Sequence, residues 1–322
     1  GWCHRGVGIS PRRVQARLLP TLAASVESVM GRRYDTISFL SDYGTDDEFV
    51  GVVKSVIREL APHATVIDLT HGVAPFDVRA GSLALARSIG YVASGVVMAV
   101  VDPGVGTSRR GIAIEVADGE GVLIGPDNGL LAPAVAMAGG AGRVVELNNP
   151  DHRLEAAGAT FDGRDVFAPA AAALCNGVDL LELGDVADAD LLFPGVVPLP
   201  QIDDTTVIAQ ALWTDRFGNV QLNIGPGDLP DGFGDVVEVR CSAPTDPTGG
   251  TTRAARRVES FAEIASGAVG LVIDSNGMLA LAMDQRSAAD ELAVADGDQV
   301  VITPLDDDPD APASVRVDLT TR

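Results

Sequence analysis

A carboxylate and a guanidinium stand seven residues apart in a glycine-containing loop that directly follows an apolar run. The run ends at Val101, and the loop reads Asp102-Pro103-Gly104-Val105-Gly106-Thr107-Ser108-Arg109. Glycines let a backbone approach a ligand closely, and Asp102 and Arg109 can face each other and hold a small polar molecule. A structural turn closed by a satisfied salt bridge explains the same residues equally well.

Three further polar clusters stand at expected strand ends or turns, at residues 41–44, 68–71 and 160–165. In an open α/β sheet the carboxyl ends of parallel strands share one edge, so Asp42, Asp68 and Asp102 can approach one another. Each acid can instead cap the helix or turn that follows it. That alternative is favoured for Asp68 and Asp165, since Asp is a preferred cap and turn residue.

The second half carries a mixed aromatic and polar cluster, Trp213-Thr214-Asp215-Arg216-Phe217-Gly218-Asn219. Its rings, carboxylate and amide suit a flat heterocycle and an ammonium group. Asn-Gly is a strong hairpin signal, so residues 127–129 and 273–277 can be ordinary turns. His71 is interpreted as a hydrogen-bonded structural histidine, and no metal site is predicted from four histidines.

Common catalytic and nucleotide-binding motifs are missing from the sequence. It contains no GxxxxGK[ST], no complete GxGxxG after a strand, no GxSxG and no HExxH. These absences argue against most common nucleotide, hydrolase and zinc chemistries.

Residues 36–190 alternate strand-like runs with helical periodicity, which predicts an α/β domain that positions these acids. Strands are expected at 36–41, 65–69, 96–101, 111–116, 121–124 and 143–146, and helices at 49–60, 78–92, 130–137 and after Arg164.

A proline-containing stretch at 189–204 breaks the alternation and is typical of a linker. Beyond it, short β-like runs predict a smaller all-β, barrel-like domain, with strands at 207–213, 220–224, 236–241, 269–273, 278–283 and 299–303. The expected divisions are an extension at 1–34, an α/β domain at 35–190, a linker at 191–204, a β domain at 205–305 and a tail at 306–322.

Composition favours a small ligand and a cytoplasmic location. A net charge of −22 disfavours binding to nucleic acid or to an anionic membrane. No apolar run reaches the roughly 18 residues of a membrane helix. Three widely spaced cysteines without a CxxC fit a reducing compartment. Residues 1–34 hold six arginines and one acid, so targeting is the alternative for that extension.

Eight ordered motifs between residues 36 and 304 resemble the S-adenosyl-L-methionine (SAM) hydroxide adenosyltransferases, which are SAM hydrolases related to fluorinases and chlorinases. The motifs are LSDYG, KSVI, IDLTHGVAPFDV, VVDPGVGTSRR, GPDNGLL, TFDGRDVFAPAA, DRFGNVQLN and IDSNG. The resemblance implies an N-terminal α/β/α domain, a smaller C-terminal β domain and a homotrimer with SAM between subunits. It implies attack of water or hydroxide on ribose C5′, with SAM as substrate and no cofactor.

The resemblance also implies roles for individual residues. Asp102 and Arg109 match two members of a water-positioning triad, and Asp42 matches the acid that binds the ribose hydroxyls. Asp47 and Asp215 would face the methionine ammonium and Ser275 its carboxylate. The remaining residues expected at the substrate are Phe76 as a pocket wall, Phe217, Asn219 and Phe261 at the adenine, and Thr160, Phe161, Gly163 and Asn276 in the matching motifs.

The third triad member departs from the family, because Asp162 stands where the family motif has histidine. Asp162 can still orient the water through an oxygen. Alternatively, Asp102 and Asp162 can share a proton, so that one of them becomes a better base. In a third interpretation the substitution cripples hydrolysis.

These interpretations lead to three hypotheses about function. The first is hydrolysis of SAM to adenosine and L-methionine. The second, from a different class, is a SAM- or adenosine-binding protein without catalysis. The third is a SAM-dependent halogenase, which is disfavoured because two acids would repel a halide.

Overall fold

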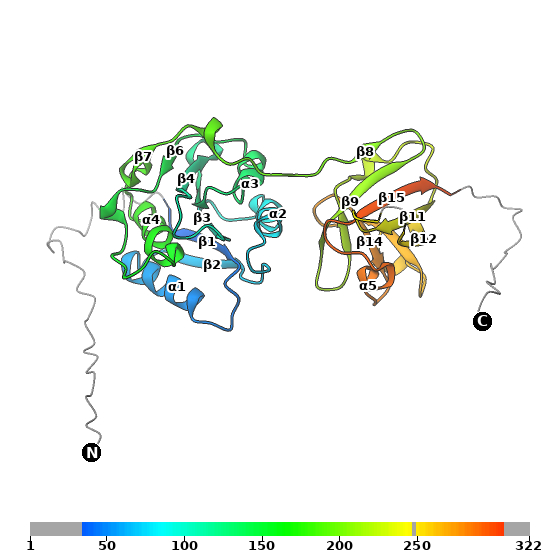
Figure 1. Ribbon diagram of the computed structural model, residues 1–322, viewed down its shortest axis with the longest axis horizontal. Coiled ribbons are helices and arrows are strands. Elements are labelled where there is room, and N and C mark those ends of the chain that lie inside the picture. The colour runs from blue at the N-terminus through cyan, green and yellow to red at the C-terminus, as the bar shows by residue number, and fades with distance from the viewer. Residues whose placement is uncertain (1–33, 247–248, 306–322) are drawn as a thin grey trace, which may run out of the picture.

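The computed structural model describes residues 34–246 and 249–305, which form an α/β domain followed by a β domain (Figure 1). Most of the expected extension (1–33) and the expected tail (306–322) lie outside the described residues. Tyr34, the last residue of the expected extension, is buried in the first domain, where its hydroxyl donates to the Gly119 carbonyl over 2.9 Å. Within the described residues, no helix has the length and apolar character needed to cross a membrane.

The first domain contains a seven-stranded mixed sheet in the order β2-β1-β3-β5-β4-β6-β7. Strands β2, β1, β3 and β5 are parallel, and β4 joins antiparallel. The strands are β1 Thr36–Ser41, β2 Thr65–Thr70, β3 Gly95–Val100, β4 Gly111–Val116, β5 Gly121–Pro126, β6 Val144–Glu146 and β7 Asp185–Val186.

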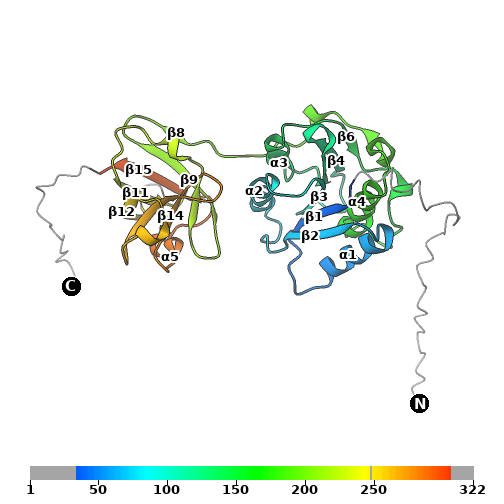
Figure 2. The same cartoon turned by 180° about the vertical axis from the view of Figure 1, so that it is seen from behind.

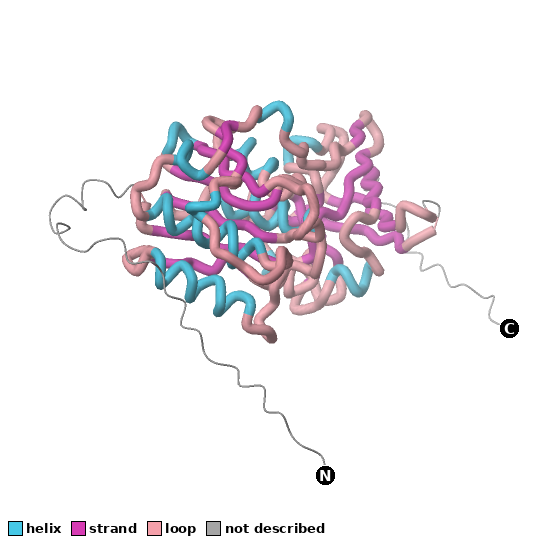
Figure 3. Tube along the Cα trace, turned by 60° about the vertical axis from the view of Figure 1, so that its left-hand side comes forward, coloured by secondary structure: helices cyan, strands magenta, loops and turns pink. Residues whose placement is uncertain are grey.

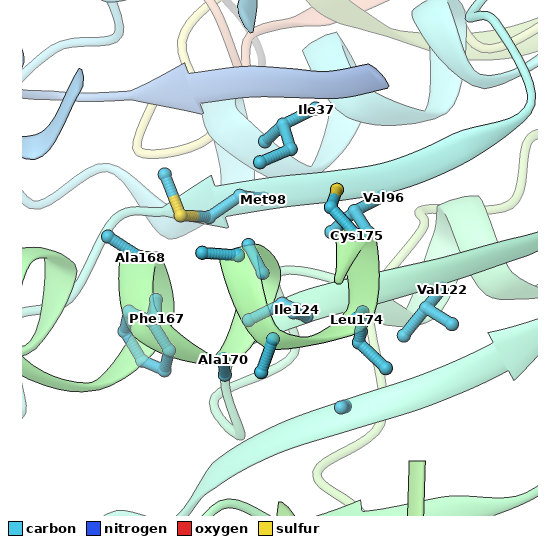
Figure 4. Close-up of a cluster of buried hydrophobic side chains, with 14 of the residues drawn as sticks. Ile37, Val96, Met98, Val122, Ile124, Phe167, Ala168, Ala170, Leu174 and Cys175 are labelled. Atoms are coloured by element: carbon cyan, nitrogen blue, oxygen red, sulfur yellow. The ribbon is translucent and has the colours of Figure 1, made fainter. Parts of the chain in front are cut away.

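Helices cover both faces of this sheet, which makes the expected α/β/α sandwich. The helices are α1 Phe49–Leu60, α2 Val78–Ile89, α3 Ala132–Met137 and α4 Ala168–Cys175. Helices α1 and α4 share one apolar core with the sheet, and α2 and α3 share another. Figure 4 shows α4 placing Leu174 and Cys175 against the strand residues of the first core. The strands lie side by side between these helix layers (Figure 3).

The second domain is a closed β-barrel, as its short strands predict. Seven strands follow the order β10-β14-β13-β12-β11-β15-β9, and β10 also pairs with β9 and closes the ring. The strands are β9 Val207–Thr214, β10 Val220–Leu222, β11 Val236–Ser242, β12 Thr251–Arg257, β13 Val269–Ile273, β14 Leu279–Met283 and β15 Gln299–Pro304. A short helix, α5 Ala288–Leu292, follows β14.

The second sheet has one further strand, β8 Gln201–Ile202, which pairs with the start of β9. It lies within the stretch expected as linker (Figure 2). Helix α2 also meets β9 directly, since Arg79 Nη2 donates to Gln210 Oε1 over 2.9 Å. Short 3-10 turns occupy Ala117–Gly119, Pro150–His152, Leu180–Leu183, Ala189–Leu191, Pro226–Asp228 and Phe261–Glu263.

Candidate active site

Two acids meet at one edge of the first sheet because their strands are neighbours. Strands β1 and β3 are parallel, and Ser41 pairs with Val100 at their carboxyl ends. Asp42 follows β1 directly, and its N–H donates to the Val100 carbonyl over 3.3 Å. Asp102 follows β3 by two residues, so both acids occupy the edge where open α/β sheets bind ligands.

Arg109 connects Asp102 to a third acid from a distant segment. Its Nε donates to Asp102 Oδ1 over 3.0 Å, and its Nη2 donates to Asp102 Oδ2 and, over 2.6 Å, to Asp162 Oδ2. The side chains of Asp102, Arg109 and Asp162 are only 6%, 8% and 18% exposed. With both acids ionised, one cation balances two anions and the group has a net charge of −1. A turn closed by one satisfied salt bridge would not need the second acid.

The environment of Asp102 makes its carboxylate more basic. Burial raises the pKa of Asp102 above its ordinary value, and the nearby Asp162 charge raises it further, against the opposing effect of Arg109. Because a raised pKa strengthens a carboxylate as a proton acceptor, Asp102 has the property required of a general base.

Asp162 begins a π-helical turn, Gly163–Phe167, that continues into α4. The Asp102 loop packs on the chain just before this turn, since a Cβ on Gly106 would lie 2.6 Å from the Ala159 carbonyl oxygen. Gly106 also has φ +77°, which favours glycine. Gly106, expected to allow close approach of a ligand, therefore allows close approach of the Ala159 backbone. This contact places the segment that carries Asp162 beside the loop that carries Arg109.

Asp42 holds Phe76 in a strained conformation. Phe76 has φ +69°, a left-handed value unusual for an aromatic residue, and its N–H donates to Asp42 Oδ2 over 2.9 Å. Phe76 is 71% exposed beside this acid. The structure therefore brings together two residues that the sequence assigns to the same pocket.

An aromatic cluster lies next to these acids and includes two residues that sequence reasoning missed, Tyr43 and Phe49. Phe161 packs edge-on against both, with ring centroids 5.7 Å and 5.2 Å away. Tyr43 directly follows Asp42 in the LSDYG motif, so the sequence could have indicated that it lies near the site. Thr160 and Asp47 lie on exposed loops, and no contact places either of them in the Asp102 group.

Asp68 does not join this edge, which corrects the expectation that it approaches Asp42 and Asp102. It lies within β2 opposite Phe39, and it pairs with Lys54 Nζ at 2.8 Å and His71 Nε2 at 3.1 Å. It does not cap a helix either. His71 also contacts Ser41 Oγ through Nδ1 at 2.8 Å, which confirms a structural, hydrogen-bonded histidine.

Asp165, the other acid expected as a cap, makes an ion pair with Arg164 at 2.6 Å. Within the described residues, no group of three or more His, Cys, Asp or Glu side chains is arranged to hold a metal ion.

A second group of expected residues lines a cavity of about 800 Å³ where α2 faces the barrel. All six residues predicted from the second half to contact the substrate line it: Asp215, Phe217, Asn219, Phe261, Ser275 and Asn276. Two turns present five of them, and Phe261 begins a separate 3-10 turn. Asp215 accepts bonds from the N–H groups of Phe217 and Asn219, at 2.8 and 2.9 Å.

The hairpin between β13 and β14 supplies the other turn. Asp274 Oδ1 accepts bonds from the N–H groups of Asn276 and Met278, at 2.8 and 3.0 Å. The interpretation of 273–277 as an ordinary hairpin turn is therefore confirmed, and the same turn lines the cavity.

Sequence reasoning missed the α2 side of this cavity, which includes Arg87 and Tyr91. The Arg87 guanidinium stacks 4.0 Å above the Trp213 ring, and its Nη1 is buried without a hydrogen-bond partner. Trp213 belongs to the cluster that the sequence singled out, but nothing in the sequence of α2 pairs Arg87 with it. No residue of the Asp102–Arg109–Asp162 group lines this cavity, so the expected residues form two separate groups in one chain.

Comparisons with known proteins agree along most of the chain. Residues 37–184 match a family model described as the SAM hydroxide adenosyltransferase N-terminal domain, and residues 209–301 match the corresponding C-terminal domain.

A protein named (R)-S-adenosyl-L-methionine hydrolase from Salinispora tropica is 41% identical over 267 residues, which are 83% of this chain and 97% of the relative. A protein of the same name from Thermus thermophilus is 38% identical, over 81% of this chain and 96% of the relative. A fluorinase from Actinoplanes is 26% identical, over 83% and 97%.

A solved structure of an uncharacterized conserved protein from Thermotoga maritima superposes with a TM-score of 0.75 at 34% identity. The match covers 83% of this chain and 99% of that one.

Proposed function

The chain belongs to the SAM hydroxide adenosyltransferase family, and we propose that it hydrolyses SAM to adenosine and L-methionine. The observation that carries this proposal is the buried Asp102–Arg109–Asp162 group at the sheet edge next to Asp42. Its carboxylates can accept hydrogen bonds from a water molecule, and Arg109 fixes both of them in place.

The proposed reaction needs few groups because the leaving group is already activated. Water attacks ribose C5′ in line with the sulfonium, a C–O bond forms, and the C5′–S electron pair passes to sulfur. Methionine then leaves as a neutral thioether, so no acid has to protonate it. The water proton passes to Asp102. Orientation of this kind contributes roughly 7–11 kcal/mol to lowering a barrier, so placement is the main task of the site.

Asp42, together with Asp47, Phe76, Thr160, Phe161 and Gly163, forms the part of the proposed substrate site in the first domain. Asp42 already uses Oδ2 to hold Phe76, so binding of the ribose hydroxyls rests on its remaining acceptor capacity. In the second domain, Asp215 would hold the methionine ammonium and Ser275 its carboxylate. Phe217, Asn219, Asn276 and Phe261 complete that part of the site and include the proposed adenine contacts.

We also propose that SAM binds between subunits of a homotrimer. The separation of the two residue groups within one chain supports this, since SAM would join the first group of one subunit to the second group of another. The two described cysteines, Cys175 and Cys241, are buried and free, which fits the cytoplasmic location that we propose.

The reaction is tested by incubating the purified protein with SAM in chloride-free, oxygen-18-labelled water and identifying products by mass spectrometry. We expect labelled adenosine and L-methionine. Unlabelled adenosine would contradict attack by water at C5′. Intact SAM that still protects the protein from thermal unfolding would instead support a binding protein without catalysis, the alternative raised by Asp162 in place of histidine.

The same assay in fluoride or chloride separates hydrolysis from halogenation. The net negative, largely buried Asp102–Arg109–Asp162 group would repel a halide, so we expect no 5′-halo product.

A further inference from the structure

Tyr43 follows Asp42 at the end of β1, and three aromatic rings fix the direction of its side chain. Phe39 packs edge-on against Tyr43 with centroids 6.3 Å apart, and Phe49 and Phe161 each lie 5.7 Å away. These neighbours come from β1, α1 and the segment before the π-helical turn. A ring held from three directions has little freedom to move its hydroxyl.

The Tyr43 hydroxyl lies against the backbone of Gly163, next to Asp162. A Cβ built on Gly163 would lie 2.2 Å from Tyr43 Oη and 3.1 Å from Cζ. Gly163 is buried, so a larger residue there would have to displace the hydroxyl. The requirement for glycine at this position therefore comes from the hydroxyl that occupies the space beside it.

Burial and the negative charge of three nearby carboxylates keep this hydroxyl protonated. Burial raises the pKa of Tyr43, and the charges of Asp42, Asp102 and Asp162 raise it further, against a smaller opposing effect of Arg109. A phenol in this environment stays neutral at any pH at which the protein works, so it remains a hydrogen-bond donor.

A donor that is not directed at a carboxylate would complement the acid group. Ionised carboxylates only accept hydrogen bonds, and Arg109 directs Nε and Nη2 at Asp102 and Asp162. A water molecule that gives both hydrogens to carboxylates and aims one lone pair at C5′ has a second lone pair that can accept a hydrogen bond.

We propose that the Tyr43 hydroxyl donates a hydrogen bond to the attacking water and sets the direction of its reactive lone pair. This inference rests on the proposed hydrolysis. Tyr43 keeps its own proton throughout. The water loses one proton to Asp102 as its oxygen bonds to C5′, and the C5′–S electron pair leaves with sulfur. Asp162 and Tyr43 would together supply the acceptor and donor capacity that one histidine combines in its two ring nitrogens.

The test compares Tyr43→Phe, Gly163→Ala and the double variant with the wild type, by kcat and KM for SAM and by thermal unfolding. Removing one donor to an oxyanion costs about 100- to 1,000-fold in kcat, and a donor to a water molecule, which carries less negative charge, contributes less. We expect Tyr43→Phe to lower kcat by about 10- to 100-fold with little change in KM. Gly163→Ala displaces the hydroxyl and should lower kcat similarly, and the double variant should lose less than the product of the two single losses.

Tyr34→Phe is the matched control, because it removes one hydroxyl at the opposite end of β1, where Tyr34 donates to Gly119. Its kcat should stay within about twofold of the wild type. The proposal is overturned if Tyr43→Phe keeps wild-type kcat, or if the losses in Tyr43→Phe and Gly163→Ala simply multiply. A wild-type protein that does not hydrolyse SAM would overturn the proposed function itself, which these variant comparisons do not address.

Discussion

Replacing Arg109 with methionine should destabilise the protein strongly, because it leaves two acids facing each other in a largely buried group. Methionine keeps the apolar stem near Phe167 but removes the only cation that contacts Asp102 and Asp162 among the described ion pairs. Breaking a buried ion pair by removing one partner costs about 3–5 kcal/mol. Asp102 and Asp162 are 6% and 18% exposed, so solvent can replace little of the lost interaction.

The assay is urea denaturation followed by circular dichroism, with thermal unfolding as a second measure. For a chain of this size the loss corresponds to a fall in Tm on the order of 10 °C. Arg286→Met is the matched control, since Arg286 is 57% exposed and pairs with Glu291 at the surface. Surface pairs contribute about 0–1 kcal/mol, so this control should unfold nearly as the wild type does.

The loss should also depend on pH in a defined direction. Burial already raises the pKa of Asp102, and Arg109 opposes that effect. Removing Arg109 raises the pKa further. A carboxyl whose pKa is higher in the folded state binds more protons there, so the full loss in Arg109→Met should be present above that raised pKa, and stability should improve as the pH falls through it. Adding Asp102→Asn and Asp162→Asn should restore stability. A loss below about 1 kcal/mol, or one independent of pH, would refute the reasoning.

Three further predictions concern individual side chains. Asp162→Asn removes a like charge beside Asp102 and should lower the pKa of Asp102, so the acid limb of the kcat/KM profile should move to lower pH. An acid limb that stays in place would show that Asp102 is not the group that accepts the proton. Asp42→Ala removes the acceptor of the Phe76 N–H and should lower kcat/KM for SAM by about 10- to 100-fold, the range of a lost charged hydrogen bond, as measured in steady-state assays. Burial raises the thiol pKa of Cys175 and Cys241 to about 12. Peptide mapping should therefore find both cysteines unlabelled by iodoacetamide in the native protein and labelled in guanidinium.

The sequence is most informative where local pattern and burial agree. Strand β1 has the expected bounds, Thr36–Ser41, because five of its six residues are buried and the polar residues after Ser41 end the run. The positions of Asp42 and Asp102 follow from parallel pairing of β1 with β3, which the alternation of strands and helices implies. The spacing of Asp102 and Arg109 allowed them to face each other, and the structure shows that they do.

Features that depend on contacts between distant segments could not be predicted from the local sequence pattern. Strand β12, Thr251–Arg257, was missed because only Ala255 is buried, and its arginines and alanines are not typical of a strand. It is a strand because β11 and β13 pair with its two edges. The stacking of Arg87 on Trp213 likewise depends on how α2 meets the barrel.

Asp162 shows why a departure from a family motif has to be judged in three dimensions. In the sequence it is an acid in place of a histidine, which is compatible with a lost activity. In the structure Asp162 contacts the same Arg109 nitrogen as Asp102, so the connection to the triad is kept while the net charge becomes more negative. A negative group favours a cationic sulfonium and disfavours a halide. It also makes Asp102 more basic. The first effect favours binding of SAM over a halide and the second favours proton transfer to Asp102, so we propose that the substitution changes how the water is held and does not abolish catalysis.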